Sequence, residues 1–462
     1  MAGATFGPWT LTQSEQARLE NYNALDVMVT ARGVDTRDEL YQRDLREAGS
    51  TFIVLSQRYV NVASLVARAG ADLLLPRAPL VKSADTKVQE RVAAIARRSK
   101  LHWLAWRTAF WTSAHGDSFL SVSDVQQVKG DDRSRAPVIS LRRAVNSVAR
   151  SIRPEDPPFR RAFLFRSKVG DLDLYLEATA GFSKWFAFRG TEALPELPAG
   201  YTPSVETKEN VPLMVHIAAP RGDSTDEGFG EADSAGTEDH TFEIANRLRQ
   251  VMKILDRHAE PAMNVPDGSI DDAGKMDPRK AKVHERGVDG LGAEYIVWQS
   301  QLGEAYTEID KLFDLIALLT ETPTALWGRD KNGNVESGRA LKFRLLAGLG
   351  KARRMGGALK EGLADAFRLA LRREDILGGR TPGEYELTVD LWETFIADEQ
   401  ETTDKVAKLR QAGVMSVRAG VEESQGLAGA DLDAEIQAIE DEAGQAPVGF
   451  GGGIASQNAP GA

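Results

Sequence analysis

Residues Thr322 to Arg344 read TPTALWGRDKNGNVESGRALKFR, and this stretch decides how the second half of the chain is organised. An apolar, helix-like stretch leads into it, and a longer helix-like stretch leaves it. Between them Gly, Asp, Asn and Lys dominate, and such residues favour turns. The sequence therefore predicts two long helices joined by a polar loop.

The loop carries the start of a calcium-binding pattern but not its remainder. The residues that match the D-x-[DN]-x-[DN] start are Asp330, Asn332 and Asn334. Val335 stands where such a loop turns on Gly, and Leu341 stands where it needs a bidentate Glu. A cation would lack its strongest ligand, so we expect no metal here. Taken locally, the stretch is an ordinary connection with Asn-Gly turn chemistry, closed by a helix cap at Asn334 or Ser337.

The bulk composition limits the function. The chain has 462 residues, 42% of them hydrophobic, and a net charge of -11, which suits roughly two to four domains. An acidic chain gains little by neutralising phosphates, so we expect no tight general DNA binding, only contact with DNA that must not stick. The absence of cysteine excludes disulfides, thiolate metal sites and a Cys nucleophile. We see no signal peptide and no apolar run long enough to span a bilayer, and therefore expect a soluble protein without membrane contact.

The first half of the chain predicts an α+β body. Residues 36–70 and 86–113 have helical spacing, and SFLSVSD (118–124) has the character of a strand. From 137 to 220, short segments rich in aromatic and branched residues are separated by Gly, Asp or Pro turns, which predicts an antiparallel sheet. Residues 219–239 are acidic and small, and we interpret them as a linker with no core-forming pattern.

The second half predicts helices around a small projection. A helix follows Thr241 and stops at Pro261. Its apolar stripe is predicted to contain Phe242, Ala245, Leu248, Met252 and Leu255. Residues 262–293 contain little apolar sequence and predict an exposed projection. An amphipathic helix covering 303–321 then leads to the quoted loop. Its apolar face is predicted to contain Leu302, Ile309, Phe313, Ile316 and either Leu319 or Thr320.

Beyond the loop the pattern is again mostly helical. A long helix is expected over 338–373, with bends where glycines cluster at 348–357. Its apolar face is predicted to contain Leu341, Leu345, Leu349, Leu359, Leu363 and Phe367. The segment GEYELTVDLW (383–392) predicts a strand that returns to the earlier sheet. Helices are expected over 396–412 and 430–443, and the low-complexity tail 444–462 is expected to be disordered.

Signatures of catalysis are missing. GLGKARR (348–354) contains Gly-Lys but lacks the earlier Gly and the Ser or Thr of a Walker A loop. No H-E-x-x-H or G-x-S-x-G pattern occurs, and the six His residues are scattered. The acidic run DEQE (398–401) fits the start of a helix, where carboxylates are favoured. We therefore expect no catalytic residue, no cofactor and no enzyme.

The order of these segments resembles the portal proteins, or head-to-tail connectors, of long-tailed (siphovirus) double-stranded DNA phages. The resemblance covers about residues 30–440. The stretches that carry it are AHGDSFLSVSD (114–124), DRHAEPAMNVPDG (256–268), EYIVWQSQLGEAYTEIDKLFDLIALLTETPTALWG (294–328), SGRALKFRLLAGLGKARR (337–354) and ETTDKVAKLRQAGVMSVRAGVEE (401–423).

The resemblance implies a portal fold in which successive segments have separate roles. A mixed α/β wing would comprise 1–240, and a two-helix stem would comprise 241–260 and 298–320. The clip, tunnel loop and crown would be 261–297, 321–336 and 396–443. The long wing helix and returning strand would lie in 337–395, before the crown, and the disordered tail in 444–462.

The family also implies an assembly and its partners. Twelve subunits would form a homo-oligomeric ring at one capsid vertex of the virion, assembled in the host cytoplasm. Double-stranded DNA would enter during genome packaging and leave during ejection through the ring. The large terminase subunit of the packaging motor, and later the head-tail adaptor, would dock on the clip. The major capsid protein and the scaffold would contact the wing.

The resemblance gives the quoted loop a role in the channel. The residues expected to touch DNA are Gly328, Arg329, Asp330, Lys331, Asn332, Gly333 and Asn334. Two cations offset partly by Asp330 and Glu336 would give weak, sequence-blind contact, and the glycines would let the backbone move. Stem acids, including Glu304, Glu308 and Asp310, and the acidic linker would repel the duplex. Two alternatives stay open: another capsid or scaffold component, and a nucleotide- or metal-dependent DNA-packaging enzyme.

Overall fold

The computed structural model describes twelve stretches of the chain. They are residues 5–30, 61–129, 132–150, 162–199, 201–220, 228–259, 263–264, 294–295, 302–329, 338–391, 399–425 and 430–445. The chain forms two compact units. One comprises Met1–Gly333 and Arg344–Thr394, and the other comprises Asn334–Phe343 and Phe395–Ala462.

Helices and antiparallel sheets are both present, which confirms the α+β class. The helices are α1 (Gln13–Thr30), α3 (Val62–Leu74), α4 (Thr86–Ser99), α5 (Leu101–His115), α6 (Glu238–Ala259), α7 (Leu302–Leu319), α8 (Gly338–Leu377), α9 (Glu399–Gln411), α10 (Val417–Gln425) and α11 (Ala430–Gln445), with the 3-10 helices η2 (Ala144–Asn146) and η4 (Thr324–Trp327). Helix α1 was not predicted, because its apolar residues form no clear stripe.

The strands of the first unit fall into several sheets. They are β1 (Thr5–Phe6), β2 (Trp9–Thr10), β3 (Leu80–Lys82), β4 (Asp117–Lys129), β5 (Asp132–Arg143), β6 (Ser147–Arg150), β7 (Ala162–Val169), β8 (Leu172–Thr179), β9 (Phe182–Arg189), β10 (Glu192–Leu194), β11 (Ser204–Glu206), β12 (Met214–Ala218), β13 (Met263–Asn264), β14 (Glu294–Tyr295) and β15 (Thr388–Asp390). The predicted antiparallel strands are confirmed. They divide, however, between a sheet of order β12-β4-β5 and a sheet of order β10-β9-β8-β7-β6, in which β11 also pairs with β9.

The two larger sheets share one buried layer, and helices cover the β12-β4-β5 sheet elsewhere. On β4, Phe119 packs with Phe163 and Phe165 of the other sheet, whereas Leu120 and Val122 join the main helical core. This alternation follows from the two-residue period of a strand. A third cluster, which includes Phe6 and Tyr175, lies beneath the β1-β2 hairpin.

Two predicted elements have different boundaries or partners in the structure. The expected helix 86–113 is divided into α4 and α5 by Lys100, which adopts a left-handed conformation with φ 51°. The strand in 383–392 does not return to the earlier sheet, because β15 pairs antiparallel with β3, and Val389 lies opposite Val81. Helix α3 confirms the part of the expected helix 36–70 that falls on described residues.

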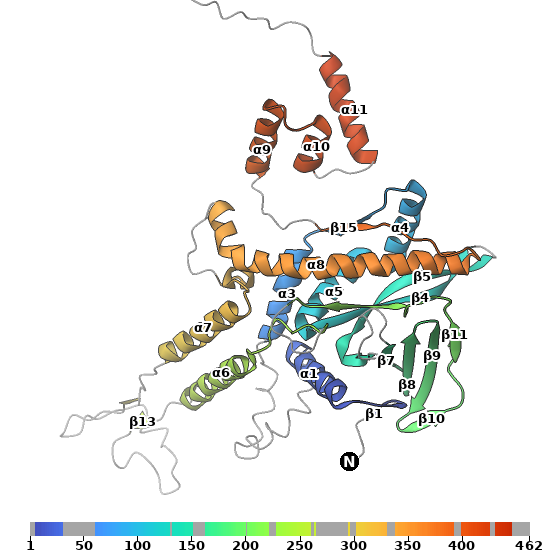
Figure 1. The fold of residues 1–462 in the computed structure, drawn as a ribbon. Coiled ribbons are helices and arrows are strands. Elements are labelled where there is room, and N and C mark those ends of the chain that lie inside the picture. The colour runs from blue at the N-terminus through green and yellow to red at the C-terminus, as the bar shows by residue number, and fades with distance from the viewer. Residues whose placement is uncertain are drawn as a thin grey trace, which may run out of the picture. The chain divides into compact units, whose positions relative to one another are not determined.

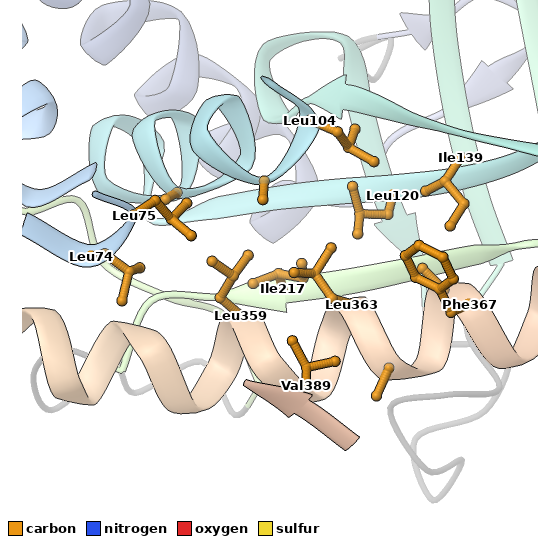
Figure 2. Packing of buried hydrophobic residues seen from close by; sticks show 14 of the residues in the cluster. Leu74, Leu75, Leu104, Leu120, Ile139, Ile217, Leu359, Leu363, Phe367 and Val389 are labelled. Atoms are coloured by element: carbon orange, nitrogen blue, oxygen red, sulfur yellow. The ribbon is translucent and has the colours of Figure 1, made fainter. Parts of the chain in front are cut away.

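Helix α8 forms the long side of the main core. In Figure 2, Leu359, Leu363 and Phe367 extend from α8 toward Leu120 and Ile217 of the sheet. All five side chains are almost inaccessible to solvent. Figure 1 shows α8 running along the sheet that contains β4 and β5. The predicted apolar face of the long helix is therefore confirmed from residue 345 onward.

The glycines of α8 allow close approach to neighbouring elements. A Cβ atom on Gly348 would lie 3.0 Å from Cδ1 of Leu73, and one on Gly362 would lie 2.4 Å from Cγ1 of Ile217. The helix is assigned without interruption from Gly338 to Leu377. The prediction of bends at the glycines of 348–357 missed this packing role of Gly348.

Helices α6 and α7 pack as a pair on the N-terminal end of α3. Ile244 of α6, Ile309 and Ile316 of α7, and Val62 and Val66 of α3 form one buried cluster. Both helices were predicted, but the stripe assigned to α6 was wrong in part. Ile244 and Val251 are buried, whereas Phe242 is 56% exposed and Leu255 is 46% exposed. Of the two residues predicted for the end of the α7 face, Thr320, just past the helix, is buried, and Leu319 is 41% exposed.

The second unit contains three short helices, α9 to α11. The sequence predicted helices at α9 and α11 but not at α10. Helix α10 begins just after Ser416, whose hydroxyl accepts a hydrogen bond from the backbone N–H of Ala419 at 3.2 Å. Val406, Val421 and Leu432 form the buried contacts. Residues 446–462, which include most of the predicted disordered tail, lie outside the described residues, as does most of the predicted projection 262–293. Among the helices that the structure describes, none has the length and apolar character of a membrane span.

Candidate functional site at the root of the polar loop

The candidate site is the place where the polar loop leaves α7. Of the predicted DNA-contacting residues, Gly328 and Arg329 are described, whereas Asp330, Lys331, Asn332, Gly333 and Asn334 lie outside the described residues. We use the name loop root for residues 320–329 together with the side chains that hold them. Its geometry shows how the loop begins.

A tight turn ends α7 and starts the loop root. The backbone N–H of Thr322 donates to the carbonyl of Ala317 at 2.9 Å, and that of Glu321 donates to Leu318 at 3.3 Å. These two bonds form a Schellman motif, in which the residue after the helix is left-handed. Glu321 takes this conformation with φ 51°, although glycine is usual there. Pro323 and the short helix η4 follow, so the chain direction changes within a few residues.

Lys351 of α8 holds this turn through hydrogen bonds. Its Nζ donates to the carbonyl of Thr320 at 3.0 Å and to Oγ1 of Thr322 at 3.2 Å, and it lies 2.8 Å from Oδ2 of Asp233. Asp233 also accepts a hydrogen bond from the Ser113 hydroxyl of α5. Lys351 is 9% exposed and Asp233 is 4% exposed. Buried charges of this kind persist only when they are paired and hydrogen-bonded.

The segment that supplies Asp233 was predicted to be an acidic linker without a core. That interpretation is wrong for residues 228–239. Ala232, Asp233 and Thr237 are buried, and a Cβ on Gly230 would lie 2.1 Å from the carbonyl oxygen of Gly116. Gly230 N also donates to Asp117 at 3.0 Å. Asp233 therefore holds the body together and is not positioned to repel a nucleic acid.

Arg329 turns back onto α7. Its guanidinium forms an ion pair with Asp310 and lies 4.3 Å from the ring centroid of Phe313. Trp327 contacts the same ring edge-on at a centroid distance of 6.3 Å. The charge of Arg329 is thus offset by Asp310, one of the acids predicted to repel DNA. Gly328 is left-handed with φ 69°, and a Cβ atom there would meet no atom within 4 Å, so glycine suits this turn.

Close packing completes the loop root. A Cβ atom on Gly348 would lie 3.0 Å from Cδ of Pro323, so α8 approaches the turn more closely than a residue with a side chain would readily allow. At the surface, Arg354 pairs with Glu321, and both side chains are about half exposed. The loop therefore starts from a point fixed by α7, α8 and the 228–239 segment.

Lys351 was included in a failed nucleotide-binding pattern and in the stretch 337–354, but no role of its own was predicted for it. The signal that the sequence analysis missed is the position of Lys351 on the helix. Lys351 adjoins the apolar face of α8 that contains Gly348, Ala352 and Met355. A lysine at such a position predicts a buried partner, although the identity of that partner, Asp233, depends on tertiary structure. Among the described residues, no group of His, Asp and Glu side chains could hold a metal ion.

Comparisons with known proteins give likenesses of fold. No protein-family model and no curated protein matches the sequence. A chain in the virion of a native gene transfer agent particle is similar over 92% of this chain and 96% of that chain, with 14% identity and a TM-score of 0.47. A chain from the neck of the native particle, computed with C12 symmetry, is similar over 91% of this chain and 95% of that chain, with 14% identity and a TM-score of 0.45. A chain from the neck of the empty particle, computed with C6 symmetry, is similar over 88% of this chain and 94% of that chain, with 14% identity and a TM-score of 0.46. At this identity, the similarities assign no function to the present chain.

Proposed function

We propose that the chain is a portal-type subunit that forms a closed ring around a channel for double-stranded DNA. The proposal is supported by the order of elements on an α+β body. Helix α6 leads to the β13-β14 pair, α7 returns, and a polar loop joins α7 to the long helix α8. In this proposal α6 and α7 are the stem, and the segment between them is the clip. Helices α9 to α11 are the crown.

The observation that carries the proposal is the apolar surface of the stem. Although α6 and α7 bury their shared seam, large side chains remain exposed on their other faces. They are Phe242 and Leu255 on α6, and Tyr306, Leu315 and Leu318 on α7. Leu318 is 74% exposed. Large apolar side chains left exposed on one part of a protein commonly mark an interaction site.

A closed ring covers such a surface without a different partner. In head-to-tail contacts, one face of each subunit meets a different face of the next, and rotation closes the ring. The exposed residues lie on both helices of the stem, so each stem offers apolar side chains to two neighbours. We propose that these contacts line up the stems around the channel, with the loop roots on the inner side.

The loop then makes weak contact with DNA. The sequence of residues 328–336 contains two cations and two carboxylates, so its formal net charge is zero. Arg329 is already paired with Asp310, which leaves Lys331 and the amides of Asn332 and Asn334 for phosphate contact. Because affinity rises with the number of neutralised phosphates, so few contacts per subunit let a duplex slide.

Assembly at one vertex of a virion follows from this role. The clip would bind the large terminase subunit during packaging and the head-tail adaptor afterwards. The wing would contact the major capsid protein and the scaffold. Both sets of contacts belong to the proposal and follow from the sequence resemblance.

Electron microscopy and native mass spectrometry of the purified protein test ring formation. We expect annular particles with a central hole, and we expect Leu318→Asp to yield folded single subunits by circular dichroism. Val414→Asp is the matched control, because Val414 is equally exposed but lies between α9 and α10 in the second unit. A wild-type protein that stays monomeric under all assembly conditions, with no rings in particles either, contradicts the proposal.

Deletion of residues 330–334 tests the role of the loop separately. The deletion spares Arg329 and the loop root, so rings should form as in the wild type. Packaging of double-stranded DNA into particles built with the variant should fail, or the packaged DNA should escape. Normal packaging and retention would remove the loop from the mechanism while leaving the ring intact.

A further inference from the structure

An aromatic groove lies at the corner between α4 and α5, away from the loop root. It has a volume of about 850 Å³ and is lined by the end of α3, the end of α4 and the start of α5. Leu75 lines it and is almost fully buried, whereas Trp103 is 58% exposed. A large exposed indole beside an apolar surface is typical of a binding site.

The aromatic side chains of this groove are held in place before any partner binds. The rings of Trp103 and Trp106 are parallel, with an interplanar angle of 3° and a centroid distance of 5.8 Å. Trp106 donates its indole N–H to Asp72 at 2.8 Å, which ties α5 to α3. Phe110 extends the stack at 5.5 Å. Rigid aromatic residues of this kind lose little conformational entropy on binding.

The groove exists because the chain turns at Lys100. This residue is left-handed, a conformation that non-glycine residues adopt at a cost of about 1 kcal/mol. It ends α4, where its N–H donates to the carbonyls of Ala96 and Arg97, and it starts α5. The turn separates the two helices, so Trp103 stands at their outer corner. Strained residues of this type cluster at functional surfaces.

The rim of the groove is basic, although the chain as a whole is acidic. Arg97 and Lys100 are exposed, and among the described residues no carboxylate forms an ion pair with either. The one acid of the lining, Asp72, already accepts the Trp106 indole. In the described part of the chain, the indole N–H of Trp103 also has no hydrogen-bond acceptor. The guanidinium of Arg107 lies over the Trp103 ring, 5.8 Å from its centroid. The site thus offers cations, an indole donor and an aromatic ring that is more than half exposed.

We infer that this groove binds an acidic peptide segment of a partner protein, with an aromatic or proline anchor. The anchor would stack on Trp103, a backbone carbonyl would accept its indole N–H, and flanking carboxylates would pair with Arg97 and Lys100. Aromatic grooves recognise proline and aromatic anchors in this way, and complementary charge sets specificity. The inference does not depend on ring formation, since every contact lies within one subunit.

Fluorescence anisotropy with labelled peptides tests the inference. The probe is a short peptide with a central Trp-Pro pair flanked by Asp and Glu. One control peptide carries Lys in place of the acids, and a second carries Ala-Ser in place of Trp-Pro. We expect saturable binding of the acidic anchored peptide only, weakening with added salt. Trp103→Ala should weaken that binding by about tenfold or more, and the double variant Arg97→Glu, Lys100→Glu should abolish it.

Matched variants outside the groove complete the experiment. Phe182→Ala removes an exposed aromatic ring from β9, and Lys168→Glu reverses an exposed charge on β7. Both should bind like the wild type. Three results would each overturn the inference: no saturable binding up to millimolar peptide, equal binding by Trp103→Ala, or equal binding of the basic peptide. Self-association that Trp103→Ala removes in sedimentation experiments would overturn it too, by assigning the groove to a second copy of the chain.

Discussion

Replacing Lys351 with Met is the sharpest test of the loop root. Methionine keeps the length and apolar stem of lysine but removes Nζ. It therefore removes the hydrogen bonds to Thr320 and Thr322 and the ion pair with Asp233. The surrounding contacts with Ala352 and Met355 on the same helix face remain available. The change thus isolates the charge and its three partners.

The expected cost follows from the burial of both charges. Lys351 and Asp233 are 9% and 4% exposed, so Met leaves a carboxylate uncompensated in the interior. Removal of one member of a buried pair costs about 3–5 kcal/mol. We expect a value near the lower end, about 3 kcal/mol, because Asp233 keeps the Ser113 hydroxyl as a donor. Adding Asp233→Asn removes the second charge and should recover about half of that loss.

Urea unfolding followed by far-ultraviolet circular dichroism measures the global effect, and hydrogen exchange measures the local one. The amide of Thr322, bonded to Ala317, should exchange about tenfold faster or more in Lys351→Met. Arg354→Met is the control, because the pair of Arg354 with Glu321 is half exposed and is worth about 1 kcal/mol at most. If Lys351→Met costs no more than this control and leaves the Thr322 amide protected, Lys351 does not hold the loop root.

Three further substitutions test the packing and the titration of the body. Gly357→Ala should raise the free energy of unfolding by about 1 kcal/mol, since its Cβ would meet no atom within 4 Å and Ala favours helix. Gly362→Ala should lower the free energy of unfolding by about 1–3 kcal/mol, because its Cβ would meet Ile217. The urea midpoints of the two variants measure both changes. Equal effects of the two substitutions would refute the close approach of Gly362 to Ile217. Burial lowers the pKa of His115 from 6.5 to about 4, despite the opposing charge of Asp117. Between pH 6.5 and pH 4 the unfolded chain therefore binds a proton at His115 that the folded chain does not bind. The free energy of unfolding falls as the pH drops below 6.5, by about 2 kcal/mol at pH 5. His115→Gln should flatten that part of the midpoint-against-pH curve, and an unchanged slope would contradict the buried neutral ring.

Local sequence pattern predicted much of the secondary structure of this chain. Short segments rich in aromatic and branched residues, separated by turn residues, identified β7, β8 and β9 as strands. The face of α8 was predicted because Leu359, Leu363 and Phe367 repeat at helical spacing and all of them are buried. Signals of this kind depend on neighbours in sequence, so they require no knowledge of the partner element.

The errors arose where tertiary contacts decide the structure. The pairing of β15 with β3 joins residues some 300 positions apart, and no local pattern specifies it. Apolar residues lie around much of α6, so sequence could not tell whether Phe242 or Ile244 faces inward. Helix α5 starts at a left-handed lysine without Gly or Pro to mark it. The packing of Gly230 on Gly116 is likewise invisible until both segments are placed.

The candidate site shows why a polar loop can start from a buried charge. A loop that contacts DNA weakly must keep its position without strong binding to hold it there. At the root, Lys351 and Asp233 supply that rigidity from the protein interior, and Asp310 neutralises Arg329 before the loop begins. In the proposed ring every subunit repeats the same loop, so even one phosphate contact per copy multiplies into a steep dependence on salt. Neutralising Arg329 keeps that sum small, which is the condition under which a duplex can move through a closed channel.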